Sequence, residues 1–267
     1  MKPVGDAAVA TWVADRAHPF AQDVGSVVPS GFEAYTRAFH PAGKGVGDDW
    51  SAVRWSDIAE ANQKVPHPEM QFESIVPQDC FEGIKSWRKG QPGLWDWPPD
   101  DGELPEDLAR DLSEVLKDHT ATPELCYFAY WDGWGDPMIA FAPTRDPQER
   151  AEQQRIEESY RTGEVFAGTP RASREQAVLL SIPGRDFYLF EGTIAEVVTG
   201  WDGISDELPS MWWPSDRAWC VATEIDLDST YVGGSRECIA ALTSHRGIEA
   251  LEAKVSHGIV RDPMNRP

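Results

Sequence analysis

The clearest strand signal in the chain is the run AWCVATEIDLDSTY at residues 218–231. Side chains alternate between the two faces of a strand, so Glu224, Asp226 and Asp228 would share one face and the apolar side chains between them the other. Gly233-Gly234-Ser235 follows shortly afterwards, which predicts a glycine turn and then a helix with Ser235 at its N-cap. A strand that is half apolar and half charged is typical of an antiparallel sheet.

Earlier segments extend this predicted sheet. Residues 125–131 are aromatic on both faces, which indicates a central strand. Residues 177–182 and 186–191 flank Pro183-Gly184-Arg185 and predict a β-hairpin. Residues 31–40 have aromatics at helical spacing between two prolines, and we favour a strand there over a helix. A further strand end within residues 49–61 leads into a helix that begins near Ser56.

Helical patterns lie between these strands and after them. Residues 7–16 predict a short amphipathic helix, and residues 104–119 a longer one with Pro105 in its first turn. Shorter helices are expected at residues 193–199, after Ser235, and around residues 248–255. Residues 62–103 form a long, packed connection. The order of elements predicts an α+β fold, with a mainly antiparallel sheet and flanking helices in a single domain over residues 1–267. Residues 143–176 are charged nearly all round and are expected to be a solvated helix or a mobile insertion in that domain.

Composition limits the classes of partner. The 267 residues include 24 Lys and Arg against 45 Asp and Glu, a formal net charge of −21. This charge argues against nucleic acid or an anionic membrane as partner, and favours a basic partner or a bound cation. Cys80, Cys126, Cys220 and Cys238 are widely spaced, which fits a reduced, cytoplasmic protein. No apolar run approaches about 18 residues, so no membrane span is expected.

Tryptophan is unusually frequent, with 12 in the chain. Most lie beside Asp, Gly or Pro, as in WDGWG at residues 131–135 and MWWP at residues 211–214. An indole packs like a core side chain but also suits a rigid binding surface. Trp131, Trp134 and Trp213 are therefore candidate ligand-binding residues. The alternative, which we favour, is that the tryptophans are anchors buried under the loops.

The carboxylates of Glu224, Asp226 and Asp228 are the sharpest candidates for chemistry. Three carboxylates along one strand repel each other unless they are solvated, paired with Arg or Lys, or bridged by a hard divalent cation. We favour a solvated face with arginine partners. The other interpretation is a small-ligand or carbohydrate site, in which indoles stack on sugar rings and paired carboxylates act as acid and base. Whether a metal binds there is left open.

Other motifs give weaker signals. Gly233, Gly234 and Ser235 could hold an anion on backbone N–H groups, although the pattern falls short of a phosphate-binding loop. The six histidines do not cluster, and neither a zinc motif nor a serine nucleophile elbow is present. We therefore expect no catalytic residues and no cofactor, and an enzyme is the less favoured class.

Two resemblances add to this interpretation. The runs GSVVPSGFEAY (25–35), YWDGWG (130–135) and WPSDRAW (213–219), the last continuing to Gly233-Gly234-Ser235, together resemble a family of uncharacterised actinobacterial-type soluble proteins. That resemblance covers most of the chain except residues 143–176 and implies no activity. The Leu104-Pro105 helix, followed by an aromatic strand ending in WDGWG, is similar to the SUKH (Smi1/Knr4-type) superfamily of immunity and interaction proteins. It covers roughly half the chain, and it implies an α+β fold with an acidic surface that binds toxins.

The sequence thus predicts a soluble, cytoplasmic, immunity-like interaction protein that binds a protein partner through an acidic, Trp-rich surface. The alternative is a small-ligand or carbohydrate binder, or an enzyme, that uses Glu224, Asp226 and Asp228 with or without a divalent cation. Oligomeric state does not follow from the sequence.

Overall fold

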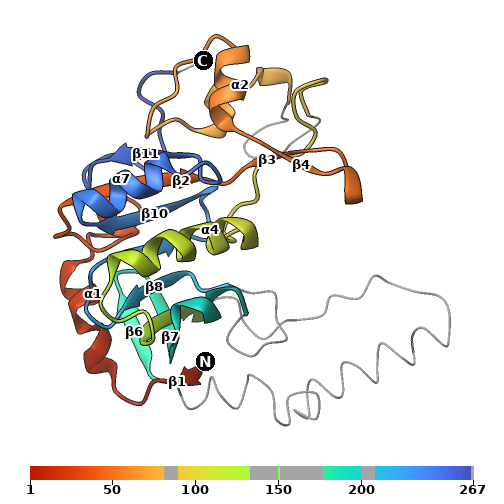
Figure 1. Ribbon diagram of the computed structural model, residues 1–267. Coiled ribbons are helices and arrows are strands. Elements are labelled where there is room, and N and C mark those ends of the chain that lie inside the picture. The colour runs from red at the N-terminus through yellow and green to blue at the C-terminus, as the bar shows by residue number, and fades with distance from the viewer. Residues whose placement is uncertain (81–89, 133–149, 151–176, 200–207, 266–267) are drawn as a thin grey trace.

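The protein is built around one large antiparallel sheet (Figure 1). The computed structural model describes residues 1–80, 90–132, 150, 177–199 and 208–265, and within them this sheet has nine strands. They are β1 (Lys2–Pro3), β2 (Ala34–Phe39), β5 (Cys126–Trp131), β6 (Leu179–Ile182), β7 (Arg185–Gly192), β8 (Met211–Pro214), β9 (Cys220–Thr223), β10 (Ser229–Gly234) and β11 (Ala250–Ala253). Their order is β1-β7-β5-β8-β9-β10-β2-β11, and β6 pairs with β7. The predicted α+β class with a mainly antiparallel sheet is confirmed.

Two helices, α4 (Glu106–Leu116) and α7 (Arg236–Ser244), cover one face of the sheet. Leu108, Leu112 and Leu116 follow each other at intervals of four, so they form one stripe along α4. All three are buried in a core cluster with Phe128 and Trp212 of the sheet. Burial of each leucine contributes roughly 1.5–3 kcal/mol, which holds the helix in place.

The N-terminal segment covers the opposite face. It contains the 3-10 helix η1 (Ala7–Ala10), the helix α1 (Thr11–Arg16) and the 3-10 helix η2 (Val24–Ser26). Trp12 and Val13 of α1 pack in a second core cluster with Trp213 and Tyr231 of the sheet. Since both faces are covered, the central strands β2, β8, β9 and β10 are buried along their whole length.

A small lobe, formed by residues 41–80 and 90–103, lies beyond one end of the sheet. It contains the two-stranded ribbon β3 (Ala42–Lys44) and β4 (Ser51–Val53), and the helices α2 (Trp55–Ala61) and α3 (Phe72–Ile75). A third core cluster joins the lobe to Phe39 at the end of β2, with Trp55, Phe72 and Trp95 at its centre. The described residues also contain the 3-10 helices η3 (Gly47–Asp49), η4 (Gln78–Cys80), η5 (Lys117–His119) and η7 (Ile194–Thr199).

Several sequence predictions are confirmed. The hairpin at residues 177–191 is β6 and β7, and the aromatic strand at residues 125–131 is β5, which lies centrally between β7 and β8. Residues 31–40 contain strand β2 rather than a helix. Residues 143–176 lie outside the described residues except Arg150, so the insertion and the single-domain assignment stay predictions. No helix in the described part of the chain is both long and apolar enough to cross a membrane.

The prediction of one continuous strand at residues 218–231 is wrong. The segment forms β9 and β10, which pair with each other as a hairpin, with Thr223 opposite Thr230. Glu224, Asp226 and Asp228 therefore lie in or beside the connecting turn, not on one strand face. Of the three carboxylates only Asp226 is exposed, and the strands on both sides of the turn are buried.

Two further predictions near the C-terminus are wrong. Gly233 and Gly234 do not form a turn but end strand β10, because the rings and side chains of neighbouring segments pack directly on them. A Cβ on Gly233 would lie 2.5 Å from Phe32 Cδ2. The segment around residues 248–255 is not a helix but contains strand β11, since its backbone completes the hydrogen-bonding edge of β2.

Candidate functional site

The carboxylates predicted to act together are held by different arginines. Glu224 forms an ion pair with Arg185, and both side chains are buried. Asp228 Oδ1 lies 3.3 Å from Nη2 of Arg37. Asp226 is exposed at the tip of the turn. Within the described residues, no group of three or more His, Cys, Asp or Glu side chains is arranged to hold a metal ion.

Arg37 is fully buried and has a structural role. Its Nε donates to Ser229 Oγ at 2.8 Å, and its Nη1 donates to the carbonyl oxygens of Met70 at 2.7 Å and Pro68 at 3.1 Å. The guanidinium also lies against three aromatic rings, those of Phe39, Trp55 and Tyr231. Burial raises the pKa of the Asp228 carboxyl, and the charge of Arg37 opposes that rise. A buried guanidinium needs such partners because leaving it unpaired costs about 3–5 kcal/mol.

The three residues of the predicted anion site take part in strand pairing and in capping of helix α7. The backbone of Gly233 is paired with Tyr35 on one side and Cys220 on the other, and Gly234 pairs with Ala34. Ser235 is the N-cap of α7, as predicted, and its hydroxyl accepts a hydrogen bond from the Cys238 N–H at 3.1 Å. These groups are therefore used by the fold.

Most of the described tryptophans are core residues. Nine of the 12 lie in the described part of the chain, and six of these are buried: Trp12, Trp55, Trp95, Trp212, Trp213 and Trp219. Trp213 packs edge-on against Trp12, with ring centroids 5.9 Å apart, so its side chain does not reach the surface. Trp131 is partly exposed at the end of β5, and Trp134 lies outside the described residues. For the six buried residues, the interpretation of tryptophans as anchors is confirmed.

Two indoles that the sequence analysis did not single out are exposed. Trp50 is 47% exposed and directly precedes β4, and Trp97 is 54% exposed on a neighbouring segment of the small lobe that bridges to β3. Gly43 of β3 lies opposite Ala52 of β4 and forms an isolated bridge with Trp97 on its other side. Directly opposed residues point to the same face, so positions 52 and 97 share the face of Gly43. A Cβ on Gly43 would lie 2.5 Å from Trp50 Nε1, so the Trp50 indole covers that same face.

A signal for this arrangement was present in the sequence. Residues 43–50 read GKGVGDDW, in which glycine alternates with other residues before two aspartates. Gly45 and Gly47 have positive φ values of 84° and 55°, which favour glycine and turn the chain between β3 and β4. Glycines in a short loop between two strand-like segments indicate a hairpin, and Trp50 lies just after this turn.

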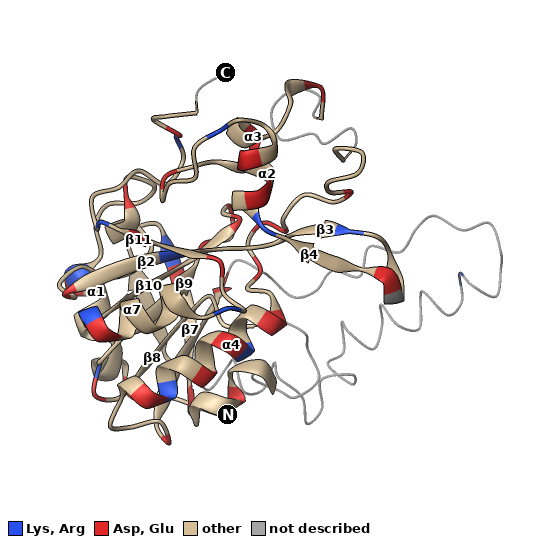
Figure 2. Cartoon of the chain, turned by 45° about the horizontal axis from the view of Figure 1, so that its top comes forward, with Lys and Arg blue, Asp and Glu red and all other residues tan. Residues whose placement is uncertain are grey.

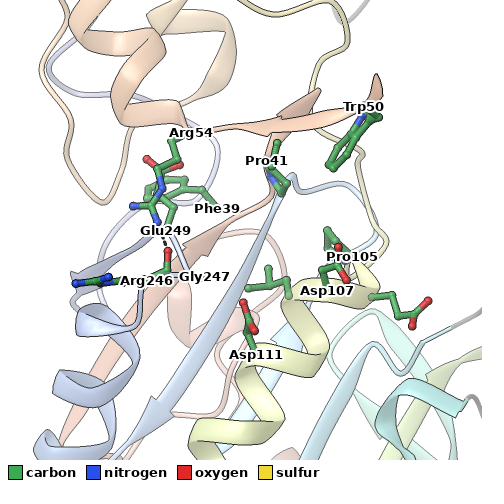
Figure 3. A pocket seen from close by; sticks show the side chains of 13 residues that line it. Phe39, Pro41, Trp50, Arg54, Pro105, Asp107, Asp111, Arg246, Gly247 and Glu249 are labelled. Atoms are coloured by element: carbon green, nitrogen blue, oxygen red, sulfur yellow. Dashed lines mark hydrogen bonds between the residues drawn. The ribbon is translucent and has the colours of Figure 1, made fainter. Parts of the chain in front are cut away.

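A pocket of about 420 Å³ opens beside this indole face (Figure 3). It lies between the ribbon, the first turns of α4 and the loop before β11. Its lining residues are Phe39, Pro41, Trp50, Ala52, Arg54, Pro105, Glu106, Asp107, Leu108, Asp111, Arg246, Gly247 and Glu249. The volume falls in the range of sites that hold small ligands or anchor side chains.

The two walls of the pocket differ in charge. The α4 wall carries Glu106, Asp107 and Asp111, and Figure 2 shows the excess of acidic residues along this helix. The opposite wall carries Arg54, Arg246 and Glu249. The Arg54 guanidinium donates to the Arg246 carbonyl oxygen, and its charge partly offsets the effect of burial, which raises the pKa of Glu249.

Glu249 also holds the start of α2. Its Oε2 accepts a hydrogen bond from the Trp55 N–H and its Oε1 one from the Ser56 N–H, both at 2.7 Å. Arg54, the N-cap residue of α2, makes no side-chain cap hydrogen bond. A carboxylate from the far end of the sequence therefore replaces the local cap and fixes the ribbon and α2 beside the pocket.

Comparison of the chain with protein-family models, with curated proteins and with solved structures found no match. The two resemblances stated from sequence therefore stay predictions.

Proposed function

We propose that this chain is a soluble, cytoplasmic, non-catalytic protein that binds a protein partner through the indole face of the ribbon and the adjoining pocket. The observation that carries the proposal is the pair Trp50 and Trp97, about half exposed on one face beside a pocket with an acidic wall. Tryptophan is enriched among residues that dominate binding energy at protein interfaces. The net charge of −21 adds support for a basic partner.

The buried thiols of the four cysteines support the proposed cytoplasmic location. Cys80, Cys126, Cys220 and Cys238 are all buried, and none of the four is in a disulfide. Burial raises the pKa of Cys126 and Cys238 to about 12, which keeps both thiols protonated and unreactive. Thiols of this kind fit a reducing compartment.

Site-specific photo-crosslinking tests the partner proposal. A benzoylphenylalanine placed at Ala52, which is exposed on the indole face, should form adducts with a partner protein in cells that express the full chain. Benzoylphenylalanine at Ser181 is the control. Ser181 is exposed on β6, which pairs with β7 towards the edge of the sheet opposite to β2 and β11. We expect adducts from position 52 alone, and their loss in Trp50→Ala and Trp97→Ala variants. Adducts that survive both substitutions, or equal yields from both positions, would show that this face does not bind a partner.

The alternative of a small-ligand or carbohydrate site at Glu224, Asp226 and Asp228 has less support. Two of its three carboxylates are paired with arginines from separate strands, Arg185 of β7 and Arg37 of β2. Thermal unfolding in the presence of divalent cations or sugars tests it. A rise in unfolding temperature that Asp226→Asn abolishes would restore this alternative.

A further inference from the structure

Part of the lining of the pocket beside the ribbon is apolar. Pro41, Pro105 and Leu108 line it together with the ring of Phe39. Such a lining suits an aliphatic stem, because methylene groups gain free energy when they leave water. The rim on the ribbon side is the Trp50 indole, whose Nε1 edge packs against Gly43.

The carboxylates on the α4 wall are available for a ligand. Asp107 and Asp111 are one turn apart on α4, so they share one side of the helix. In the part of the chain that the structure describes, neither side chain has a hydrogen-bond or ion-pair partner, whereas Glu106 on the same turn pairs with Arg110. The Asp111 carboxylate lies so close to Gly247 that a Cβ on that glycine would collide with it.

The two arginines of the opposite wall do not neutralise these carboxylates. Arg54 is directed to the Arg246 carbonyl oxygen and lies beside Glu249. The Arg246 side chain points away from α4 (Figure 3). The pocket therefore has an aromatic ring on its ribbon rim and two carboxylates on its α4 wall, of which Asp111 lies against Gly247. An aromatic ring and carboxylates are groups that bind a cation, through cation–π attraction and charge-assisted hydrogen bonds.

We infer that this pocket receives a basic side chain of the partner, with a guanidinium or ammonium group on an aliphatic stem. The cation lies between the Trp50 ring and the carboxylates of Asp107 and Asp111, and the stem follows Pro105 and Leu108. This inference rests on the proposed function, since it names the chemistry by which the partner is recognised.

Titration of the full-length chain with a blocked amino acid tests the inference directly. The probe is N-acetyl-arginine N-methylamide, and its neutral isostere N-acetyl-citrulline N-methylamide is the matched control. Binding is followed through the indole N–H resonance of Trp50 in protein labelled with ¹⁵N-tryptophan, assigned by its loss in Trp50→Phe. We expect a saturable shift with the arginine probe in the millimolar range, weakened by added salt, and none with the citrulline probe.

Substitutions on α4 locate the bound cation. Asp107→Asn and Asp111→Asn should each weaken arginine binding about tenfold, the size expected for a hydrogen bond to a charged group. Glu114→Gln removes one charge from an exposed position of the same helix outside the pocket and should leave the affinity unchanged. Gly247→Ala displaces the Asp111 carboxylate without a change of charge and should also weaken binding.

The outcomes separate this inference from the proposed function. No shift with the arginine probe, equal binding of the citrulline probe, or no effect of the two Asp substitutions would overturn the cation site. If crosslinking at position 52 still succeeds in that case, the partner proposal stands without it. If the chain binds the arginine probe saturably but forms no specific adducts from position 52, the cation site is supported and the proposed partner surface is contradicted.

Discussion

The Trp50 indole lies directly against the backbone of Gly43, so close that a Cβ at position 43 would come within 2.5 Å of Trp50 Nε1. Gly43 is also the residue that pairs with Ala52 on one side and Trp97 on the other. The glycine at the centre of β3 thus leaves room for the Trp50 ring, while the second exposed ring, Trp97, is carried by the neighbouring chain segment. The position of Trp50 at the pocket is therefore set by the absence of a side chain at residue 43.

Gly43→Ala should displace the Trp50 indole with little loss of stability. The φ value of Gly43 is not in the left-handed region, so alanine fits its backbone and the exposed ring moves instead. We expect a changed Trp50 indole resonance, weaker binding of the arginine probe, and a change in unfolding free energy within about 1 kcal/mol. Heteronuclear NMR and urea unfolding measure these quantities. An unchanged indole resonance would mean that Trp50 does not rest on Gly43 in solution.

Trp95 and Trp97 should differ sharply in their effect on stability, although they are two residues apart. Trp95 is fully buried and packs against Phe72 with ring centroids 5.2 Å apart. Trp95→Ala should cost about 3–5 kcal/mol, because a large side chain is removed from a packed cluster. Trp97→Ala removes an exposed ring and should cost less than about 1 kcal/mol while it abolishes crosslinking from position 52. Similar costs in urea unfolding would place both rings in the core.

Glu249→Gln should loosen the start of α2. The substitution replaces a carboxylate that accepts two backbone hydrogen bonds with an amide that has a single acceptor oxygen. We expect a loss of about 1–2 kcal/mol and faster hydrogen exchange at the amides of Trp55 and Ser56. The exposed Glu252→Gln on β11 is the control. Unchanged exchange at those two amides would show that α2 is capped in another way.

His40 should make the protein less stable as the pH falls. The pKa of this fully buried imidazole is lowered to about 4, chiefly by burial and also by the nearby charge of Arg37, while the hydrogen bond to the Asp100 backbone opposes the change. Its Nδ1–H donates to the Asp100 carbonyl oxygen, and its Nε2 accepts from the Thr230 hydroxyl, which requires the neutral ring.

The direction of this pH effect follows from the pKa of His40 in the folded and in the unfolded protein. The unfolded histidine has a pKa of about 6.5 and binds a proton before the folded one does, so stability is lost as the pH falls from about 7 towards 4. Between about pH 7 and pH 5 the loss due to His40 is on the order of 2 kcal/mol. Urea unfolding of the wild type and of His40→Gln at both pH values measures it as the difference between their pH dependences. Parallel profiles would contradict the neutral buried imidazole.

Local patterns predicted much of the fold. The leucine stripe of α4 and the Pro-Gly turn between β6 and β7 fix elements through contacts close in sequence, and both were correct. The wrong predictions concern segments whose secondary structure is determined by contacts with residues distant in the sequence. Residues 218–231 alternate like one strand, but the buried pairs of Arg37 with Asp228 and Arg185 with Glu224 hold the middle of the run as a turn. Around Ile248 and Leu251 the spacing was helical, yet the free edge of β2 determined a strand.

The candidate site was less accessible to sequence reasoning than the fold. Residue type alone could not separate the buried Trp213 from the exposed Trp50, because exposure depends on which segments cover each ring. The pocket is assembled from residues 39–54, 105–111 and 246–249, which come together only through the sheet and the small lobe. Arg54 and Arg246 had no motif around them, and only their shared position at the pocket gives them a role.

The place of strand β2 in the sheet has a consequence for how the protein is made. Residues 34–39 pair with residues 229–234 on one edge and residues 250–253 on the other, so both partners of this strand are synthesised long after it. At 5–20 residues per second, the ribosome needs roughly 10–40 s to produce them after β2 has emerged. During that interval Tyr35 and Phe39 remain without the neighbours that later bury them. This part of the sheet therefore closes only after residue 253 has been synthesised, and the small lobe, anchored on Phe39 and capped by Glu249, acquires its final position in the same step.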